Sequence, residues 1–298
     1  MYRILSLCSG YGGLDLAVEE HFNARTAYWS DIDQTSCLIM GTRFPEAEPI
    51  GDLTLLGDTT FDVDIITAGY PCQPWSLAGR REGENDTQGR HLWPYIANTI
   101  GVSRPRWVVL ENVAGHLTLG GPAVIASLVS YGYSVRWVTL RASDAGAPHQ
   151  RKRLFIVAHA NSTGLQGCRS EHQLQKDCQE GEVGGSYQDV ADTPSTERGK
   201  PQHECLGSSF GSATEFGECV SSVEWGQYEL AIRRWESILG RAAPPPVDDG
   251  KLSPGFVEWM MGCDRGWVCD LVESRAKALK VLGNGVVKQQ CALALSLI

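Results

Sequence analysis

The fold is set by the opening stretch Tyr2-Arg-Ile-Leu-Ser-Leu-Cys-Ser-Gly-Tyr-Gly-Gly13. Its first part predicts a buried strand over residues 2–7, and a glycine-rich turn follows it directly. Leu14, Ala17 and Val18 then share one face of a predicted helix. A strand, a glycine turn and a helix in this order are typical of a nucleotide-binding α/β sheet. A tight turn that binds no ligand explains the glycines equally well.

Further apolar runs along the chain each lead to a polar or reactive side chain. The residues in question are Asp31, Asp52, Cys72 and Glu111. Because the carboxyl ends of parallel strands share one edge, where α/β sheets bind ligands, we predict a site at this edge. Residues 133–140 and 153–159 predict two more strands that close the sheet. The predicted fold is α/β, with a Rossmann-like, doubly wound, mostly parallel sheet.

Each of these side chains also has a simpler explanation. Asp31 or its neighbour Asp33 is suited to cap the helix that begins near Gln34, and Asp52 is suited to begin a turn. Cys72 lies between two prolines in Gly69-Tyr-Pro-Cys-Gln-Pro-Trp-Ser76, where a buried structural thiol is the commoner case. The regular occurrence of such residues at strand ends favours a ligand site.

Composition limits the class of protein. The chain has 298 residues, 42% of them hydrophobic, and a formal net charge of −9. No apolar run has membrane-spanning length and no signal pattern opens the chain, so we expect a cytoplasmic protein without membrane contact. We expect its 10 cysteines to be reduced thiols. The negative charge by itself argues against a nucleic-acid partner.

The charge is concentrated in residues 160–250, which carry 7 Lys and Arg against 15 Asp and Glu. This stretch is rich in Gly, Ser, Gln and Glu and has weak periodicity, so we predict a separate, irregular domain over 160–251. The main domain then comprises 1–159 and 252–298, with a predicted helix over 252–262 capped by Ser253. Because Cys168, Cys178, Cys205 and Cys219 form no Cys-x-x-Cys pair, we expect no metal.

Two polar segments flank the predicted site. The loop 76–89 is rich in glycine and carries Arg80 and Arg81, a composition typical of a lid and also of an ordinary surface loop. His149-Gln-Arg-Lys-Arg153 is the most basic stretch of the chain and leads into a predicted strand. It is suited to hold a phosphate or a polar base edge, although a solvated turn is the default interpretation.

Taken together, these segments resemble the cytosine-5 DNA methyltransferase family over residues 3–157 and 252–298. The resemblance rests on segments that occur in the family's order: Cys-Ser-Gly-Tyr-Gly-Gly13, Ser-Asp-Ile-Asp33, Gly-Asp-Leu53, Gly69 to Ser76, Glu-Asn-Val113, Gln-Arg-Lys-Arg153 and Gly-Asn-Gly-Val-Val287. Two positions depart from the family pattern, since Cys8 and Trp75 stand where Phe is usual. The resemblance implies methylation of carbon 5 of cytosine in duplex DNA, by base flipping and a covalent cysteine adduct.

By this resemblance Cys72 is the nucleophile, and Glu111 contacts the exocyclic amine and ring nitrogen 3 of the base. Arg153 then contacts the ring carbonyl, and Arg151 positions Cys72. The implied cofactor is S-adenosylmethionine, with S-adenosylhomocysteine as product and no metal. Its implied contacts are Cys8, Gly10, Tyr11, Gly12, Gly13, Asp31, Ile32, Asp52, Leu53, Pro71, Leu92, Asn284, Gly285 and Val286.

The family also implies the partners. The stretch 160–251 takes the place of its target-recognition region, and we predict DNA contacts by Gln73, Ser76, Arg81, Arg233 and Arg234. We expect a monomer of small bacterial or phage type, associated with the nucleoid, with a cognate restriction endonuclease as a possible partner. An RNA (tRNA) cytosine-5 methyltransferase and a catalytically inactive DNA-binding relative are the alternatives. A flavin or nicotinamide oxidoreductase would leave Cys72 and Glu111 without a role.

Overall fold

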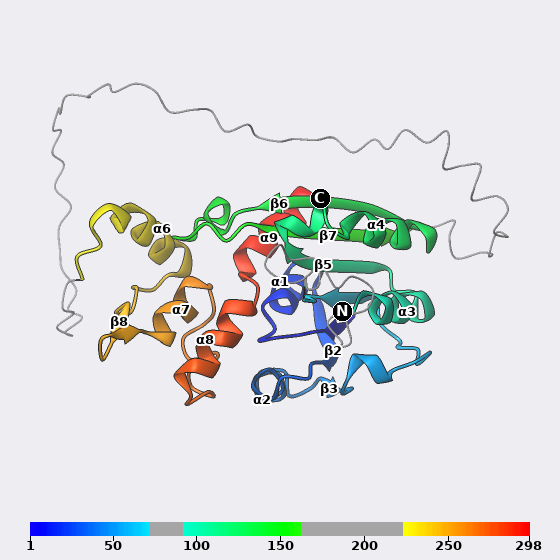
Figure 1. The fold of residues 1–298 in the computed structure, drawn as a ribbon, viewed down its shortest axis with the longest axis horizontal. Helices are drawn as coiled ribbons and strands as arrows, with labels where there is room; N and C mark the ends of the chain where they lie inside the picture. Colours follow the sequence, from blue (N-terminus) through cyan, green and yellow to red (C-terminus); the bar gives the residue numbers. More distant parts are fainter. Residues whose placement is uncertain (72–91, 162–222) are drawn as a thin grey trace, which may run out of the picture. The chain divides into compact units, whose positions relative to one another are not determined.

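The computed structural model describes residues 1–71, 92–161 and 223–298. Helices and strands alternate along the first part of the chain (Figure 1). The strands are β1 (Tyr2–Leu7), β2 (Ala24–Ser30), β3 (Glu48–Pro49), β4 (Ile65–Ala68), β5 (Trp107–Val113), β6 (Tyr133–Leu140), β7 (Arg153–Ala160), β8 (Val247–Asp248) and β9 (Lys251–Leu252). The helices are α1 (Gly13–Phe22), α2 (Gln34–Arg43), α3 (Trp93–Ser103), α4 (Gly121–Ser130), α6 (Glu229–Leu239), α7 (Pro254–Met260), α8 (Arg275–Asn284) and α9 (Lys288–Leu297). The 3-10 helices are η1 (Leu53–Leu55), η3 (Ala114–Leu117), η4 (Ala142–Ala145) and η5 (Gly226–Tyr228).

One sheet joins the first seven strands in the order β3-β2-β1-β4-β5-β7-β6. Strands β1 to β5 are parallel to one another, whereas β7 runs antiparallel to both β5 and β6. The strand order reverses at β1, because β2 and β3 lie on one side of it and β4 on the other. Open α/β sheets bind ligands at such a reversal, beyond the carboxyl ends of the strands. The predicted mostly parallel α/β sheet is confirmed.

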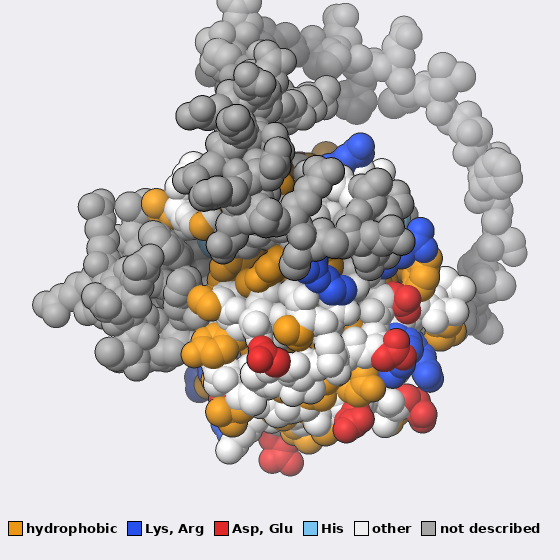
Figure 2. Space-filling view, turned by 90° about the vertical axis from the view of Figure 1, so that its right-hand side faces the viewer, with side chains coloured by type: hydrophobic (Ala, Val, Ile, Leu, Met, Phe, Trp, Pro, Cys, Tyr) orange, Lys and Arg blue, Asp and Glu red, His pale blue; other side chains and the backbone are white. Residues whose placement is uncertain are grey.

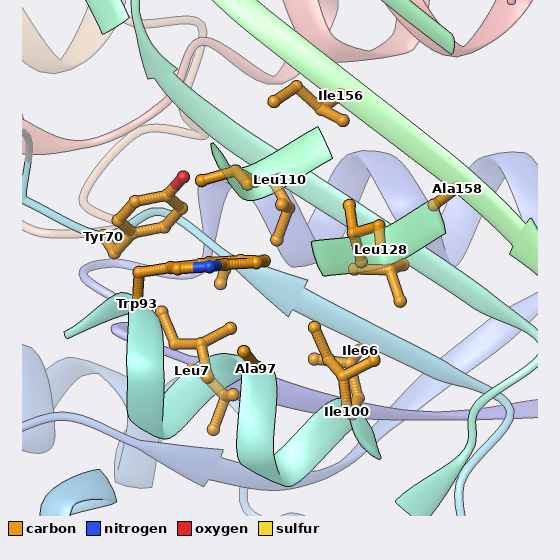
Figure 3. Close-up of a cluster of buried hydrophobic side chains, with 14 of the residues drawn as sticks. Leu7, Ile66, Tyr70, Trp93, Ala97, Ile100, Leu110, Leu128, Ile156 and Ala158 are labelled. Carbon is orange, nitrogen blue, oxygen red and sulfur yellow. The ribbon is translucent and has the colours of Figure 1, made fainter. Parts of the chain in front are cut away.

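Helices cover both faces of the sheet. Since successive strand residues point to opposite faces, Leu5 and Leu7 pack in one apolar cluster with α3 and α4. Ile4 and Val109 point the other way and pack with α1 and α9. Figure 3 shows the first of these clusters, in which side chains from α3 and α4 lie against those of the strands. Burial on both faces explains why the strands are continuous apolar runs in the sequence.

The C-terminal helices pack around aromatic side chains. Trp235 of α6 and Trp259 of α7 are fully buried, and the Trp235 indole Nε1–H donates to the Trp259 carbonyl at 2.9 Å. The chain then turns around the buried carboxylate of Glu258, which accepts backbone N–H groups at 2.6 to 2.9 Å. The sequence did not predict α8, which includes Gly283 and Asn284 in its last turn. The helix therefore ends within the Gly-Asn-Gly segment, with Gly285 as its C-cap.

Contacts divide the chain into two units. The first comprises Met1–Cys168 and Trp225–Ile298, and the second comprises Arg169–Glu224. Helix α6 belongs to the first unit, although it lies within the predicted domain 160–251. The domain boundaries expected from the sequence stay a prediction.

The surface of the described residues is mixed in charge. Figure 2 shows Lys and Arg side chains interspersed with Asp and Glu on one face of the molecule. Within the described ranges, the structure contains no helix with the length and hydropathy needed to cross a membrane. In the same ranges, His, Cys, Asp and Glu form no group of three or more suited to hold a metal ion. The cysteines between 168 and 219 that were considered as metal ligands lie outside the described residues.

Candidate active site

The strand register brings the predicted site residues to one edge of the sheet. Leu7 of β1 pairs with Ser30 of β2 and with Ala68 of β4, and Ala68 pairs with Leu110 of β5. These residues therefore form one row across four strands. The residues that follow them in the chain are Cys8, Asp31, Gly69 and Glu111. The predicted common edge is thus fixed by hydrogen-bonded pairing.

The glycine turn after β1 combines two kinds of glycine. At Gly13 an added Cβ would lie 2.4 Å from the carbonyl oxygen of Val286, so this position is needed for close packing. At Gly10, where φ is +60°, an added Cβ would meet no described atom within 4 Å. Gly12 resembles Gly13, because a Cβ there would lie 2.4 Å from the Phe44 ring. Open space is therefore found over Gly10, where a ligand is able to approach the backbone.

Asp31 and Asp33 have different tasks. The Asp33 carboxylate accepts hydrogen bonds from the backbone N–H groups of Thr35 and Ser36 and caps α2. The Asp31 carboxylate accepts from the Gly10 N–H at 2.9 Å and from the Asp33 N–H at 2.9 Å. Burial raises the pKa of Asp31, and these two hydrogen bonds oppose the increase. Asp31 is thus directed at the glycine turn.

Asp52 and Cys8 complete this side of the site. Burial, together with the nearby charges of Asp31 and Asp52, raises the pKa of the Cys8 thiol to about 12. Asp52 caps η1, since its Oδ1 accepts from the Thr54 N–H and hydroxyl at 2.8 Å. Cys8, Asp31 and Asp52 therefore lie in one electrostatic neighbourhood. We name these three residues and Gly10 the cofactor side.

The other hydrophobic residues predicted as cofactor contacts differ in exposure. Ile32 is 75% exposed next to Asp31, whereas Leu53 is buried at 4% and packs in the cluster of α3 and α4. Leu92 is partly buried against the same cluster. Ile32 therefore presents most of its side chain at the surface.

The opposite side of the site is built around Glu111. This residue lies within β5, where it pairs with Phe155 of β7, and it is 6% exposed. Its Oε1 lies 2.9 Å from Nε of Arg153. Burial raises the pKa of Glu111 to about 7, while the charges of Arg153 and Arg151 oppose the increase. Glu111 is thus able to exist in both protonation states near neutral pH. We name Glu111, Arg151 and Arg153 the base side.

Arg151 joins the base side to the end of α8. Its Nη1 donates to the Gly283 carbonyl at 2.9 Å, and its Nη2 donates to the Gly285 carbonyl. The amide of Gln290 in turn donates to the Arg151 carbonyl at 3.0 Å. The predicted contact of Arg151 with Cys72 stays a prediction, because Cys72 lies outside the described residues. The sequence did not indicate Gln290, because its role in holding the Arg151 backbone becomes visible only from its buried position and its hydrogen bond.

Residues 284–286 reach the glycine turn through Tyr11. The Tyr11 hydroxyl donates to the Val286 carbonyl, and the Tyr11 carbonyl accepts from the Trp267 indole at 2.9 Å. An added Cβ at Gly285 would lie 1.9 Å from the Tyr11 ring. Tyr11 is 1% exposed, so its side chain serves packing, whereas Asn284 is exposed at the end of α8.

The predicted nucleophile follows directly from this edge. Gly69 lies between the two sides, because an added Cβ there would lie 3.8 Å from Glu111 Oε2 and 3.9 Å from the Cys8 carbonyl oxygen. The described chain ends at Pro71, which is exposed. Cys72, Gln73, Ser76 and Arg81, with the loop 76–89, lie outside the described residues. Their predicted roles therefore stay predictions.

The two arginines predicted to contact DNA lie on α6. Arg233 is exposed and forms ion pairs with Glu229 at 2.8 Å and Glu236 at 2.7 Å. Arg234 is also exposed. Glu229 and Glu236 stand four residues before and three residues after Arg233, so both ion pairs follow from helical spacing.

The chain is similar in sequence to known proteins. The family model described as C-5 cytosine-specific DNA methylase matches residues 2–234. Type II methyltransferase M.NlaIV of Neisseria lactamica is 30% identical over 178 residues, which are 54% of this chain and 42% of that protein. Type II methyltransferase M.HhaI of Haemophilus parahaemolyticus is 31% identical over 169 residues, which are 55% of this chain and 51% of that protein. The matches thus span about half the length of these relatives.

A solved structure supports the fold. The crystal structure of the S. pombe Dnmt2 methyltransferase is similar with a TM-score of 0.61 and 17% sequence identity. The likeness covers 100% of this chain and 98% of that chain. At this identity it bears on the fold alone, and it agrees with a class I methyltransferase arrangement of the sheet.

Proposed function

This chain belongs to the C-5 cytosine-specific DNA methylase family, and we propose that it transfers a methyl group from S-adenosylmethionine to carbon 5 of cytosine in a specific duplex DNA sequence. The observation that carries the proposal is the shared edge of the sheet. There the cofactor side and the base side flank Gly69, three residues before Cys72. Such an arrangement suits a reaction in which a base and a methyl donor meet at one thiol.

The chemistry requires a nucleophile of this type. Carbon 5 of cytosine is unreactive because the aromatic ring holds its electrons. The Cys72 thiolate adds an electron pair to carbon 6, which breaks the aromaticity and makes carbon 5 nucleophilic. Carbon 5 forms a bond to the methyl carbon, whose bond to sulfur breaks with the electron pair left on sulfur. The carbon 5 proton then leaves to solvent, and its electron pair expels Cys72 as the thiolate.

The base side stabilises this addition. Negative charge moves toward ring nitrogen 3 as the thiolate adds, and protonated Glu111 donates a hydrogen bond there. Its pKa of about 7 keeps a substantial protonated fraction at neutral pH. Arg153, whose Nε already pairs with Glu111, presents its remaining donors to the ring carbonyl. Arg151 holds the neighbouring backbone of 283–285 in place.

The cofactor side fits S-adenosylmethionine. Ribose hydroxyls are donors that suit the Asp31 carboxylate, which retains acceptor capacity beyond its two backbone partners. The space over Gly10 admits close approach of a ligand. Cys8 to Gly13, Ile32, Asp52, Leu53, Pro71, Leu92 and Asn284 to Val286 are the further residues proposed to surround it. When bound, the sulfonium supplies an electrophilic methyl group, with S-adenosylhomocysteine as the product, and the proposed reaction needs no metal.

Double-stranded DNA is the proposed partner. The target base must leave the helix, at a cost of a few kcal/mol, before carbon 6 becomes accessible. Gln73, Ser76, Arg81, Arg233 and Arg234 are the proposed DNA contacts, and residues 160–251 the proposed recognition domain. We further propose a monomer that acts in the cytoplasm of a bacterial or phage-infected cell, at the nucleoid. A cognate restriction endonuclease would be its partner in defence.

An RNA substrate is the second candidate, since the catalytic residues would be the same. The chain lacks the Cys-Phe-Thr signature of the branch that acts on tRNA, and the curated relatives are type II methyltransferases. DNA is therefore the substrate favoured here.

Methyl transfer tests the proposal. Labelled S-adenosylmethionine is incubated with duplex DNA of varied sequence and with tRNA, and bisulfite sequencing then locates the modified cytosine. We expect incorporation into one DNA motif, and Cys72→Ser should lose turnover while still binding duplex. Normal methylation by Cys72→Ser would refute the assigned nucleophile. Incorporation into tRNA alone would refute the DNA substrate.

A further inference from the structure

Tyr70 is held at three points just before the proposed nucleophile. Its carbonyl accepts from the Asn112 side-chain amide at 3.1 Å, and its hydroxyl lies 2.9 Å from His116 Nε2. Its ring centroid lies 5.9 Å from that of Trp93, and Figure 3 shows the two rings next to each other. Tyr70 is 5% exposed and His116 3% exposed. The backbone that leads through Pro71 to Cys72 therefore starts from a fixed residue.

These contacts connect the ends of two neighbouring strands. Asn112 directly follows Glu111 in β5, and His116 lies in η3, which continues from that strand. Tyr70 follows the end of β4. The contacts of Tyr70 thus tie the strand that leads to Cys72 to the strand that carries Glu111.

The His116 ring is suited to accept a hydrogen bond from the Tyr70 hydroxyl. Burial lowers the pKa of His116, which favours the neutral imidazole, and a hydrogen bond with the Leu119 backbone opposes this shift. A hydrogen bond that an imidazole N–H donates to a backbone carbonyl is expected to raise the pKa of the histidine in this way. In the tautomer that carries its proton on the other ring nitrogen, Nε2 accepts the hydrogen bond from the Tyr70 hydroxyl. The rings of Tyr70 and His116 meet edge to face at 82°.

We infer that the Tyr70–His116 hydrogen bond is a positioning element that fixes the backbone two residues before Cys72 relative to Glu111. The inference rests on the proposed function, in which Cys72 and Glu111 act on the same base. Tyr70 and His116 act through the backbone and are positioning residues. A misplacement of about 1 Å can cost a reaction roughly 100-fold in rate, so loss of one such contact should be visible in kcat.

Kinetics of three variants test the inference. Tyr70→Phe removes only the hydroxyl, and His116→Leu removes the acceptor. We expect kcat to fall about tenfold in each, while KM for DNA and the Kd for S-adenosylmethionine change less than about twofold. The double variant should be no slower than the single ones, because both changes remove the same hydrogen bond.

Tyr133→Phe is the matched control. Tyr133 is also a buried tyrosine, 3% exposed, and its hydroxyl donates to the Pro105 carbonyl at 2.7 Å. Its loss removes a comparable hydrogen bond away from the site. We expect kcat of this variant to stay at the wild-type value, even if its melting temperature falls as far as that of Tyr70→Phe.

Alkylation of Cys72 separates this inference from the proposed reaction. Its rate with iodoacetamide, followed by peptide mass spectrometry without DNA, should change at least threefold in Tyr70→Phe and not in Tyr133→Phe. If Tyr70→Phe and His116→Leu keep both kcat and the alkylation rate, or if Tyr133→Phe alters both equally, the inference is wrong. A Tyr70-dependent alkylation rate in a protein that methylates nothing would support the positioning and contradict the proposed reaction.

Discussion

On the cofactor side the carboxylate of Asp31 is held by two backbone N–H groups, whereas on the base side the carboxylate of Glu111 is held by arginine. Both acids lie in the same row of strand ends. Backbone donors fix the orientation of Asp31 and leave its negative charge for ligand hydroxyls. The arginine offsets the negative charge of the buried Glu111 carboxylate. Burial raises the pKa of this acid and the ion pair lowers it, so their balance sets the protonated fraction. The first side is thus suited to the proposed binding of the cofactor, and the second to the proposed change of charge.

Removal of Arg153 is expected to have the largest effect, because it leaves Glu111 buried without its closest ion-pair partner. In Arg153→Ala, kcat should fall about 10²- to 10³-fold, and the free energy of unfolding should fall by roughly 3 kcal/mol. Methylation kinetics and urea unfolding measure the two effects. The double variant Glu111→Gln/Arg153→Ala should regain stability but not activity. Equal stability of Arg153→Ala and wild type would contradict this description of the base side.

Glycine substitutions test the cofactor side. Gly13→Ala forces a Cβ toward the Val286 carbonyl and should lower the free energy of unfolding by about 1–3 kcal/mol. Gly10→Ala meets open space and should cost only about 1 kcal/mol, for its left-handed backbone. It should nevertheless weaken S-adenosylmethionine binding more than tenfold, as measured by calorimetry. If Gly10→Ala binds S-adenosylmethionine with unchanged affinity, the cofactor does not bind at this turn.

The pH dependence sharpens the contrast. The pKa of Glu111, about 7, is raised above its ordinary value, so folding favours the protonated form. Its contribution to stability is therefore present at low pH and declines as the pH rises from about 5 through 7. Wild type should lose stability relative to Glu111→Gln across this window. The part of kcat that depends on protonated Glu111 should fall about tenfold for each pH unit well above 7. The pH profile of Glu111→Gln should lack this decrease. Parallel profiles of the two proteins would contradict the assignment.

Asp31→Asn is expected to have a smaller effect. The substitution keeps an oxygen that is able to accept from the Gly10 N–H but removes the charge. The Kd for S-adenosylmethionine should rise about three- to tenfold, with kcat at saturating cofactor nearly unchanged. A fall in kcat without a change in Kd would indicate a role on the base side instead.

The smallest effects are expected on α6. Because Arg233 is paired with Glu229 and Glu236, Arg234→Ala should weaken DNA binding more than Arg233→Ala, by a few-fold. Each lost phosphate contact should reduce the salt slope of log K by about 0.9, and cofactor binding should not change. DNA affinity equal to wild type in both variants would exclude these arginines from the DNA-reading surface.

Several parts of the fold were predictable because local chemistry decides them. Strand β6 has the predicted bounds Tyr133–Leu140, since its ends coincide with changes in apolar pattern. Ser253 caps α7 as expected, and its hydroxyl accepts from the Phe256 N–H. The site residues themselves came from the family resemblance, because no periodicity reveals which strand-end acid binds a ligand.

Other features depended on contacts between distant parts of the chain. Helix α8 contains Gly283 and Asn284 in its last turn, and its packing among the C-terminal helices outweighs this weak local propensity. The sequence likewise left open which acid caps α2, and only the folded turn brings the Gly10 N–H to Asp31.

The sequence by itself determined most of the alternation of strands and helices and placed polar or reactive residues after the apolar runs, since these features follow from residue type and spacing. Only the tertiary structure decided which of those residues meet. Tyr11 reaches Val286 across 275 residues, and Tyr70 reaches His116 across 46, through contacts that exist only once the sheet and its helices are in place. Hydrogen bonds of this range depend on the closure of the whole fold, which no local pattern encodes.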